Sequence, residues 1–163
     1  MRDAVGYILR IASEEWVRQV FDMAIYCTSL SRKWKEGQTM LFVSKTGVGE
    51  MVVGYGVIQD VISTYGLSEE ERRKCEEHGW KRVIEFTYVK RFERPLPLKK
   101  TFLKDSRFRG RYLHGLAISK EQLDSIVSQA ENSRPRQSQT IIQNDRRLSH
   151  ISKRLLLAEA LLP

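Results

Sequence analysis

The stretch EMVVGYGVIQDVIS, residues 50–63, decides the fold that the sequence predicts. It is a long run of β-branched, aromatic and other apolar residues, a composition typical of a strand. Gly54 and Gly56 interrupt the run, and glycine inside a strand permits a bulge or a tight bend. We therefore expect one long, curved strand, which favours a small barrel over a doubly wound sheet.

Shorter segments on both sides complete the predicted domain. Apolar runs indicate further strands at residues 4–11, 39–45, 80–90 and 112–118. Helical spacing and capping residues indicate helices at residues 13–25, 68–79 and 119–130. Because this order lacks regular β-α-β units, the sequence predicts an α+β fold, a small mixed β-barrel with flanking helices.

The predicted helix starts carry specific capping signals. Ser13 is a predicted N-cap, and the pairs Ser68 with Glu71 and Ser119 with Gln122 have the spacing of a capping box. In a capping box each side chain satisfies a backbone N–H group that the helix itself leaves unpaired. These signals fix where the helices should begin.

Prolines and composition divide the rest of the chain. Pro95 and Pro97 are expected to end the strand from residue 80, and an extended basic loop is expected from there to Gly110. Residues 1–131 form the predicted domain, 132–143 a polar basic linker and 144–163 an extra C-terminal helix. One stripe of that helix is apolar, formed by Leu148, Ile151, Leu155, Ala158 and Leu162. The stripe fits either docking on the domain itself or pairing with a second copy in a homodimer.

The totals place the chain among globular proteins. It has 163 residues, 41% of them hydrophobic and 29% charged, with no apolar run long enough to span a bilayer. The N-terminus lacks the features of a secretory signal, so we expect a cytoplasmic protein. Cys27 and Cys75 fit that compartment as free thiols. Cys75 and His78 have the spacing of half a zinc site, but no second half is present in the sequence, so no metal and no cofactor are predicted.

Positive charge is concentrated in one segment. The net charge is +8, and residues 90–111 contain nine basic and two acidic residues, which leaves seven of those charges. Such clustering favours a polyanionic partner, since cations neutralise phosphates and interleaved aromatic rings stack on unpaired bases. The predicted nucleic-acid-binding residues are Lys99, Lys100, Lys104, Arg107, Arg109 and Arg111. The alternative is strand geometry alone, with Phe108 and Tyr112 in the core and the arginines in solvent.

Motifs of catalysis are missing from the sequence. There is no P-loop, no G-x-G-x-x-G, no G-x-S-x-G and no H-E-x-x-H. The clustered glutamates fall in predicted first turns or on exposed helix faces. His114 follows the basic loop on the last predicted strand, where it could approach a phosphate or a base, or simply be hydrogen-bonded in place. The residues therefore predict no catalytic group.

Several short motifs, in order, resemble a known family. They are KWKEGQ (33–38) leading into MLFVS (40–44), VVGYGVI (52–58), VKRFERPLPLK (89–99) and RYLHGLAIS (111–119). Together they resemble EVE-domain proteins of the PUA-like superfamily, and among these an uncharacterised, mainly archaeal branch. The resemblance covers about residues 4 to 128.

The resemblance implies a small β-barrel with flanking helices, in which related EVE and YTH domains bind a modified base in a pocket. By position, Tyr26, Cys27 and Thr28 would lie at the rim of that pocket, Gly54 on its floor, and Tyr112 and His114 on the last strand. Gln38 stands where the family has an aspartate, and the tryptophans of YTH-type cages have no assigned counterparts.

Three functions follow as hypotheses. The first is a non-catalytic nucleic-acid-binding module, with RNA favoured over DNA. The second is a small amidohydrolase acting on a modified nucleoside, because ASCH-type relatives use a lysine, a threonine and a glutamate, for which Lys45, Thr46 and Glu50 are the right types. The third is a protein–protein adaptor that uses the C-terminal helix.

Overall fold

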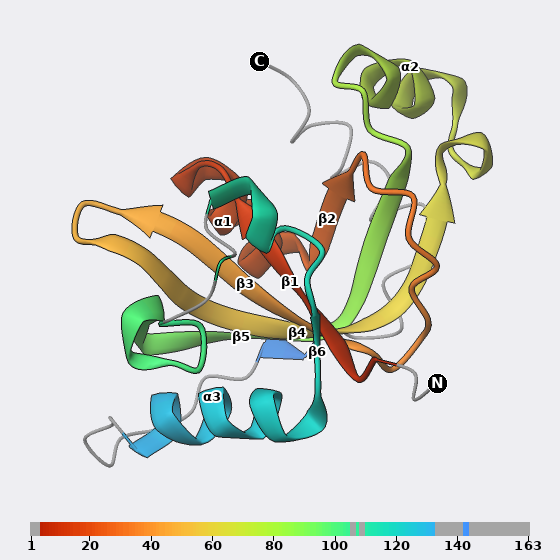
Figure 1. Ribbon diagram of the computed structural model, residues 1–163. Helices are drawn as coiled ribbons and strands as arrows, with labels where there is room; N and C mark the ends of the chain where they lie inside the picture. Colours follow the sequence, from red (N-terminus) through yellow and green to blue (C-terminus); the bar gives the residue numbers. More distant parts are fainter. Residues whose placement is uncertain (1–3, 105–106, 108–109, 133–141, 144–163) are drawn as a thin grey trace.

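The computed structural model describes residues 4–104, 107, 110–132 and 142–143 (Figure 1). Its strands are β1 (Gly6–Ile11), β2 (Ile25–Thr28), β3 (Thr39–Thr46), β4 (Gly49–Ser63), β5 (Arg82–Pro97), β6 (Ala117–Ile118) and β7 (Ile142–Gln143). Its α-helices are α1 (Glu14–Met23), α2 (Glu69–Glu77) and α3 (Lys120–Asn132). Short 3₁₀ turns are η1 (Thr64–Gly66), η2 (Leu98–Lys100) and η3 (Gly110–Leu113).

The strands form one mixed sheet. Its order is β2-β5-β4-β3-β1-β6, with β7 paired to β5 beside this path. β1 runs parallel to β3, and the other pairs are antiparallel. The predicted α+β class is confirmed, but the predicted closed barrel is wrong. β2 and β6 end the path with no hydrogen bonds between them in the described residues, and their four and two residues are too short to close a barrel.

The long β4 strand is bent as its glycines predict. Its register with β5 shifts between Val52 and Gly54 and again around Ile58, so bulges curve the sheet. A Cβ atom at Gly54 would collide with the carbonyl oxygen of Lys90 and the ring of Phe21. Gly54 therefore lets β5 and α1 approach β4 closely, and it lies in the core rather than on the floor of a pocket.

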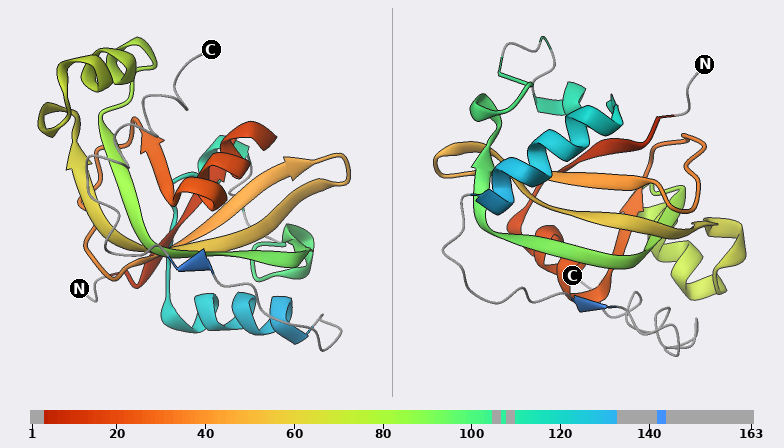
Figure 2. Two further views of the ribbon diagram at one scale, coloured as in Figure 1. Left: turned by 180° about the vertical axis from the view of Figure 1, so that it is seen from behind. Right: turned by 90° about the horizontal axis from the view of Figure 1, so that it is seen from below.

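Two hydrophobic cores cover the two faces of the sheet, and Figure 2 shows α1 and α3 on opposite sides of it. On the α1 face, the ring of Phe42 makes edge contacts with Phe21 and Phe86, at centroid distances of 5.6 and 5.4 Å. On the α3 face, Leu113 and Ile126 are fully buried. Each apolar face is therefore covered by a helix or a turn.

The predicted caps are confirmed. Ser13 Oγ accepts a hydrogen bond from the backbone N–H of Trp16 at 3.3 Å. The capping box of α2 is complete, with Ser68 and Glu71 bonded in both directions. The equivalent pair at α3, formed by Ser119 and Gln122, is complete as well.

Two predicted strand limits are wrong. β5 continues through Pro95 to Pro97, because β2 leaves β5 after Glu85 and the prolines lie where that edge carries no described partner strand. The predicted strand at 112–118 is mostly turn, and only Ala117–Ile118 is extended. The reason is the positive φ of Gly110 and Gly115, 55° and 82°, which breaks the strand conformation.

Some predictions lie outside the described residues. These are Arg109 with its neighbour Phe108, most of the linker, and the whole C-terminal helix at 144–163. Among the described helices, none combines the length and the apolar character needed to cross a bilayer.

Candidate nucleic-acid-binding site

Two cavities lie on either side of one ion pair. The first, the aromatic cavity, has a volume of about 260 Å³ and is lined chiefly by Trp16, Tyr26, His78, Trp80 and His114 together with Arg10. The second, the lysine-rimmed cavity, has a volume of about 380 Å³ and is lined by Glu50, three leucines and three lysines among others. Arg10 Nε and Nη2 donate to Glu50 Oε1 at 3.0 and 2.9 Å, so this pair joins the two cavities.

Three segments bring the rings of the aromatic cavity together. Trp16 comes from the first turns of α1, Tyr26 from β2, and Trp80 follows α2. Gly79, at φ 71°, turns the chain so that the Trp80 N–H donates to the carbonyl of Cys75 at 2.8 Å. The Trp16 and Trp80 rings meet edge to face at 5.1 Å, and His78 stacks on Trp80 at 4.3 Å. The result is a rigid aromatic wall.

His114 faces this wall from the turn after η3. The backbone N–H of Gly115 donates to the carbonyl of Ile8 at 2.7 Å and anchors the turn to β1. The backbone N–H of Arg10 donates to His114 Nδ1 at 3.1 Å, which fixes the imidazole ring. The ring lies 6.4 Å from that of Tyr26, centroid to centroid.

Burial sets the protonation of the two polar rings. It raises the pKa of Tyr26 to about 12, helped by the neighbouring Cys27 thiol, so the phenol stays protonated. Burial and the nearby Arg10 guanidinium lower the pKa of His114 from its ordinary value, so the imidazole is neutral at neutral pH.

The two cysteines are free thiols, as predicted, and both are buried. Cys27 lines the aromatic cavity and shares a hydrogen bond with Cys75, which raises the pKa of Cys27 together with burial and lowers the pKa of Cys75. His78 does not join Cys75 in a metal site, and the described residues contain no cluster of three or more metal-ligating side chains.

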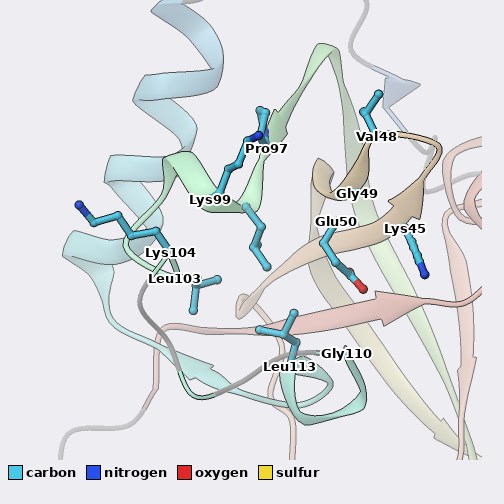
Figure 3. Close-up of a pocket in the computed structure, with 11 residues that line it drawn as sticks. Lys45, Val48, Gly49, Glu50, Pro97, Lys99, Leu103, Lys104, Gly110 and Leu113 are labelled. Atoms are coloured by element: carbon cyan, nitrogen blue, oxygen red, sulfur yellow. The ribbon is translucent and has the colours of Figure 1, made fainter.

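The lysine-rimmed cavity has an apolar floor and a cationic edge. Leu98, Leu103 and Leu113 form the floor, and Figure 3 shows the last two pointing into the space between η2 and the β3–β4 hairpin. Lys45 from β3, Lys99 from η2 and Lys104 stand around it and are exposed. Within the described part of the chain, no ion pair involves these three amines.

Other cations of the basic segment have structural partners. Lys90 Nζ is buried and bonds to Glu131 of α3 at 2.8 Å. Arg91 contacts Glu14 of α1 at 3.4 Å and lies over the ring of Phe21. These two residues link β5 to helices on opposite faces of the sheet, and neither lines the lysine-rimmed cavity.

The structure brings together part of the predicted pocket. Tyr26, Cys27 and His114 line one cavity, whereas Gly54 lies in the core. Thr28 is buried, and its hydroxyl accepts from the Leu30 N–H at 3.1 Å. Tyr112 is 61% exposed and lines neither cavity, with Arg111 stacked over its ring. Thr28, Gly54 and Tyr112 therefore do not line the cavity that contains Tyr26, Cys27 and His114.

The predicted basic residues divide in a similar way. Lys99 and Lys104 line the lysine-rimmed cavity, while Lys100, Arg107 and Arg111 are exposed beside it in the chain. Sequence reasoning missed Arg10, Trp16 and Trp80 as cavity residues. No local signal marks them, because they meet only through the fold.

Only two of the three residues of the hydrolase hypothesis line the same cavity. Lys45 and Glu50 are partners across the β3–β4 hairpin, and both line the lysine-rimmed cavity. Thr46 has another role, since its hydroxyl donates to the carbonyl of Gly49 at 3.0 Å and accepts from the Val48 N–H at 3.3 Å. The threonine therefore shapes the hairpin turn.

Comparison with known proteins identifies the fold. No family model matches the chain, and no curated protein matches it in sequence. Crystal structures of ASCH from Zymomonas mobilis do match it. A variant with serine replaced by alanine has a TM-score of 0.56 and 15% identity, over 79% of this chain and 99% of that one. The fold is that of an ASCH domain.

Two more ASCH structures from the same organism agree. A tyrosine-to-phenylalanine variant has a TM-score of 0.53 and the protein without a stated substitution 0.52, both at 16% identity and over 74% of this chain. The matched regions cover 95% and 92% of those two ASCH chains. These matches show that the chain shares the fold of the ASCH structures. The EVE branch and the archaeal origin stay predictions.

Proposed function

We propose that this chain is a non-catalytic nucleic-acid-binding module that holds one unpaired base in the aromatic cavity and contacts phosphates with the lysine rim. One observation carries the proposal: an aromatic cavity and a ring of unpaired lysines lie on either side of the Arg10–Glu50 pair. A single strand of nucleic acid presents the two complementary groups side by side, a base that stacks on aromatic rings and a phosphate that pairs with lysines.

The aromatic wall supports the base-binding part. Stacking on aromatic side chains stabilises an unpaired base by about 1–3 kcal/mol, whichever base is present. Trp16 and Trp80 are held against each other and against His78, so little side-chain entropy is lost when a ring stacks on them.

The lysine rim supports the phosphate-binding part. Lys45, Lys99 and Lys104 lack carboxylate partners among the described residues, in contrast to Lys90 and Arg91. Unpaired exposed cations release counterions when they bind phosphates, so affinity falls steeply with salt.

The need for an unpaired base favours single-stranded RNA over duplex DNA. A base can enter an aromatic cavity only when it is unpaired and unstacked, and sequence-specific RNA recognition mostly targets such bases in loops and single strands. Duplex DNA presents its bases stacked and paired, and flipping one out costs a few kcal/mol.

The test is fluorescence anisotropy with labelled single-stranded RNA, duplex RNA and duplex DNA over a salt series. We expect single-stranded RNA to bind most tightly, and replacement of Lys45, Lys99 and Lys104 by glutamine to weaken it. A matched control replaces the exposed Lys33, Arg73 and Lys120, which removes the same charge away from both cavities. Equal losses in the two variants, or no binding at low salt, would contradict the proposal.

A hydrolase acting on modified nucleosides is the second candidate. Its support is that Lys45 and Glu50 face one cavity across the hairpin. Incubation with N-acylated nucleosides, followed by chromatography, tests it directly. Turnover that is lost in Lys45→Gln would replace the binding-only proposal.

A further inference from the structure

Among the polar groups of the aromatic cavity with no protein hydrogen-bond partner in the described residues are the hydroxyl of Tyr26 and Nε2 of His114, both on residues that line the cavity. The other ring nitrogen of His114 is already bonded to the backbone of Arg10. Both groups are therefore free to bond to a ligand in this cavity.

The hydrogen bond to Arg10 decides what His114 offers. Nδ1 accepts a hydrogen bond from the backbone N–H of Arg10 at 3.1 Å, so Nδ1 itself carries no hydrogen. A neutral imidazole then carries its hydrogen on Nε2. His114 consequently presents a fixed N–H donor, and no acceptor, to the cavity.

Tyr26 offers a second donor. Its hydroxyl stays protonated across the physiological range, because burial raises its pKa to about 12. A phenolic O–H donates one hydrogen bond and can also accept one. The side chains of the cavity are thus richer in donors than in acceptors.

Strong acceptors are missing from the same wall. Among the described residues that line the cavity there is no aspartate, glutamate, asparagine or glutamine. Glu50, which is bonded to the Arg10 guanidinium, lines the other cavity. An exocyclic amino group, which is recognised by carboxylate or amide oxygens, would find little to bind.

We propose that the aromatic cavity selects a base with an exocyclic oxygen, of the uracil or hypoxanthine type, over one with an exocyclic amine, through Tyr26 and His114. This inference rests on the proposed function and names its ligand class. Uracil and cytosine have nearly the same size and stacking surface and share the O2 carbonyl, so only the rest of the base edge separates them: O4 with N3–H in uracil, and the N4 amine with a bare N3 in cytosine. A base with an exocyclic amine leaves that amine and the donors of Tyr26 and His114 without hydrogen-bond partners. We expect its affinity to be about tenfold weaker.

The experiment compares labelled hexamers of uridine and cytidine by anisotropy at neutral pH. The native protein should bind the uridine hexamer about tenfold more tightly. Tyr26→Phe removes only the hydroxyl, and His114→Asn keeps an acceptor for the Arg10 N–H while removing the Nε2 donor. Both variants should bring the affinity ratio toward one. Tyr112→Phe removes an exposed hydroxyl outside the cavity and should leave the ratio unchanged.

The outcomes separate this inference from the proposed function. Equal affinities for the two hexamers, or a ratio that Tyr26→Phe and His114→Asn do not change, would overturn the inference and leave RNA binding standing. Failure of both hexamers and of mixed-sequence RNA to bind at low salt would overturn the proposed function itself.

Discussion

The two cavities differ in how their groups are held, although they share the Arg10–Glu50 pair. The aromatic cavity is built from four half-buried rings and the exposed ring of His78, which contact one another, and a backbone hydrogen bond fixes the ring of His114. The lysine-rimmed cavity carries exposed amines on long side chains above an apolar floor. In our proposal, the fixed donors of Tyr26 and His114 in the aromatic cavity discriminate between bases, whereas the exposed lysines attract any polyanion.

The largest expected effect is on the rigid wall. Trp80→Ala removes the ring between Trp16 and His78, and with it a stacking surface of about 1–3 kcal/mol per base. We expect affinity for single-stranded RNA to fall about 5- to 150-fold, with the salt dependence unchanged. Anisotropy over a salt series measures both quantities. An unchanged affinity would show that the base does not bind in the aromatic cavity.

Removing the lysines should change the salt dependence of RNA binding, which Trp80→Ala leaves unchanged. Replacing Lys45, Lys99 and Lys104 by glutamine should lower the slope of log affinity against log salt by about two, since each phosphate contact on a single strand contributes about 0.7. Affinity should fall at low salt and differ little from that of the native protein at high salt. The uridine-to-cytidine ratio should stay the same, and a changed ratio would show that the cavities do not have separate roles.

The sequence predicts what local chemistry determines. The curved strand follows from Gly54 and Gly56 in an apolar run, and the start of α2 from the spacing of Ser68 and Glu71. The backbone needs only nearby residues to form these features. Tyr26, Cys27 and His114 line one cavity, and the sequence predicted this grouping only through the resemblance to a family.

The rest of the site depends on contacts between distant segments. Trp16 and Trp80 are 64 positions apart and meet at 5.1 Å only because α1 and the end of α2 pack around β2. In the sequence, Lys90 and Arg91 belong to the basic segment, but tertiary contacts pair them with Glu131 and Glu14. Pattern alone does not separate a structural cation from a ligand-binding one.

Acid should affect the aromatic cavity before the lysine rim. The folded-state pKa of His114 lies below its unfolded value of about 6.5, so below that pH the unfolded chain takes up protons more readily. The free energy of unfolding should therefore fall as pH decreases from about 6.5 toward the lowered pKa. Protonation also places a hydrogen on Nδ1, against the Arg10 N–H.

Thermal unfolding of the native protein and of His114→Asn across pH 4–8 measures this loss. The other groups at the ring, Arg10, Tyr26, Cys27 and the more distant His78, supply no carboxylate that would stabilise the imidazolium. His78→Asn removes an exposed histidine as the control. If native protein and His114→Asn lose stability equally in acid, His114 is not the group responsible.

The smallest effect is expected at the shared ion pair. The Arg10 and Glu50 side chains are 25% and 24% exposed, and solvent screens such a pair, so Glu50→Gln should lower the free energy of unfolding by about 1 kcal/mol. Chemical denaturation measures this change. A loss of several kcal/mol would mean that the pair is a main support of the fold rather than a wall between two cavities.

The central claim is that an unpaired base stacks in the aromatic cavity, and the three tryptophans of the chain provide the most direct test. In ¹H–¹⁵N spectra each indole N–H gives its own resonance during a titration with single-stranded RNA. Trp16 and Trp80 should shift strongly, while Trp34, buried against Tyr7 and lining neither cavity, should not. RNA binding that leaves the Trp16 and Trp80 resonances in place would contradict the account.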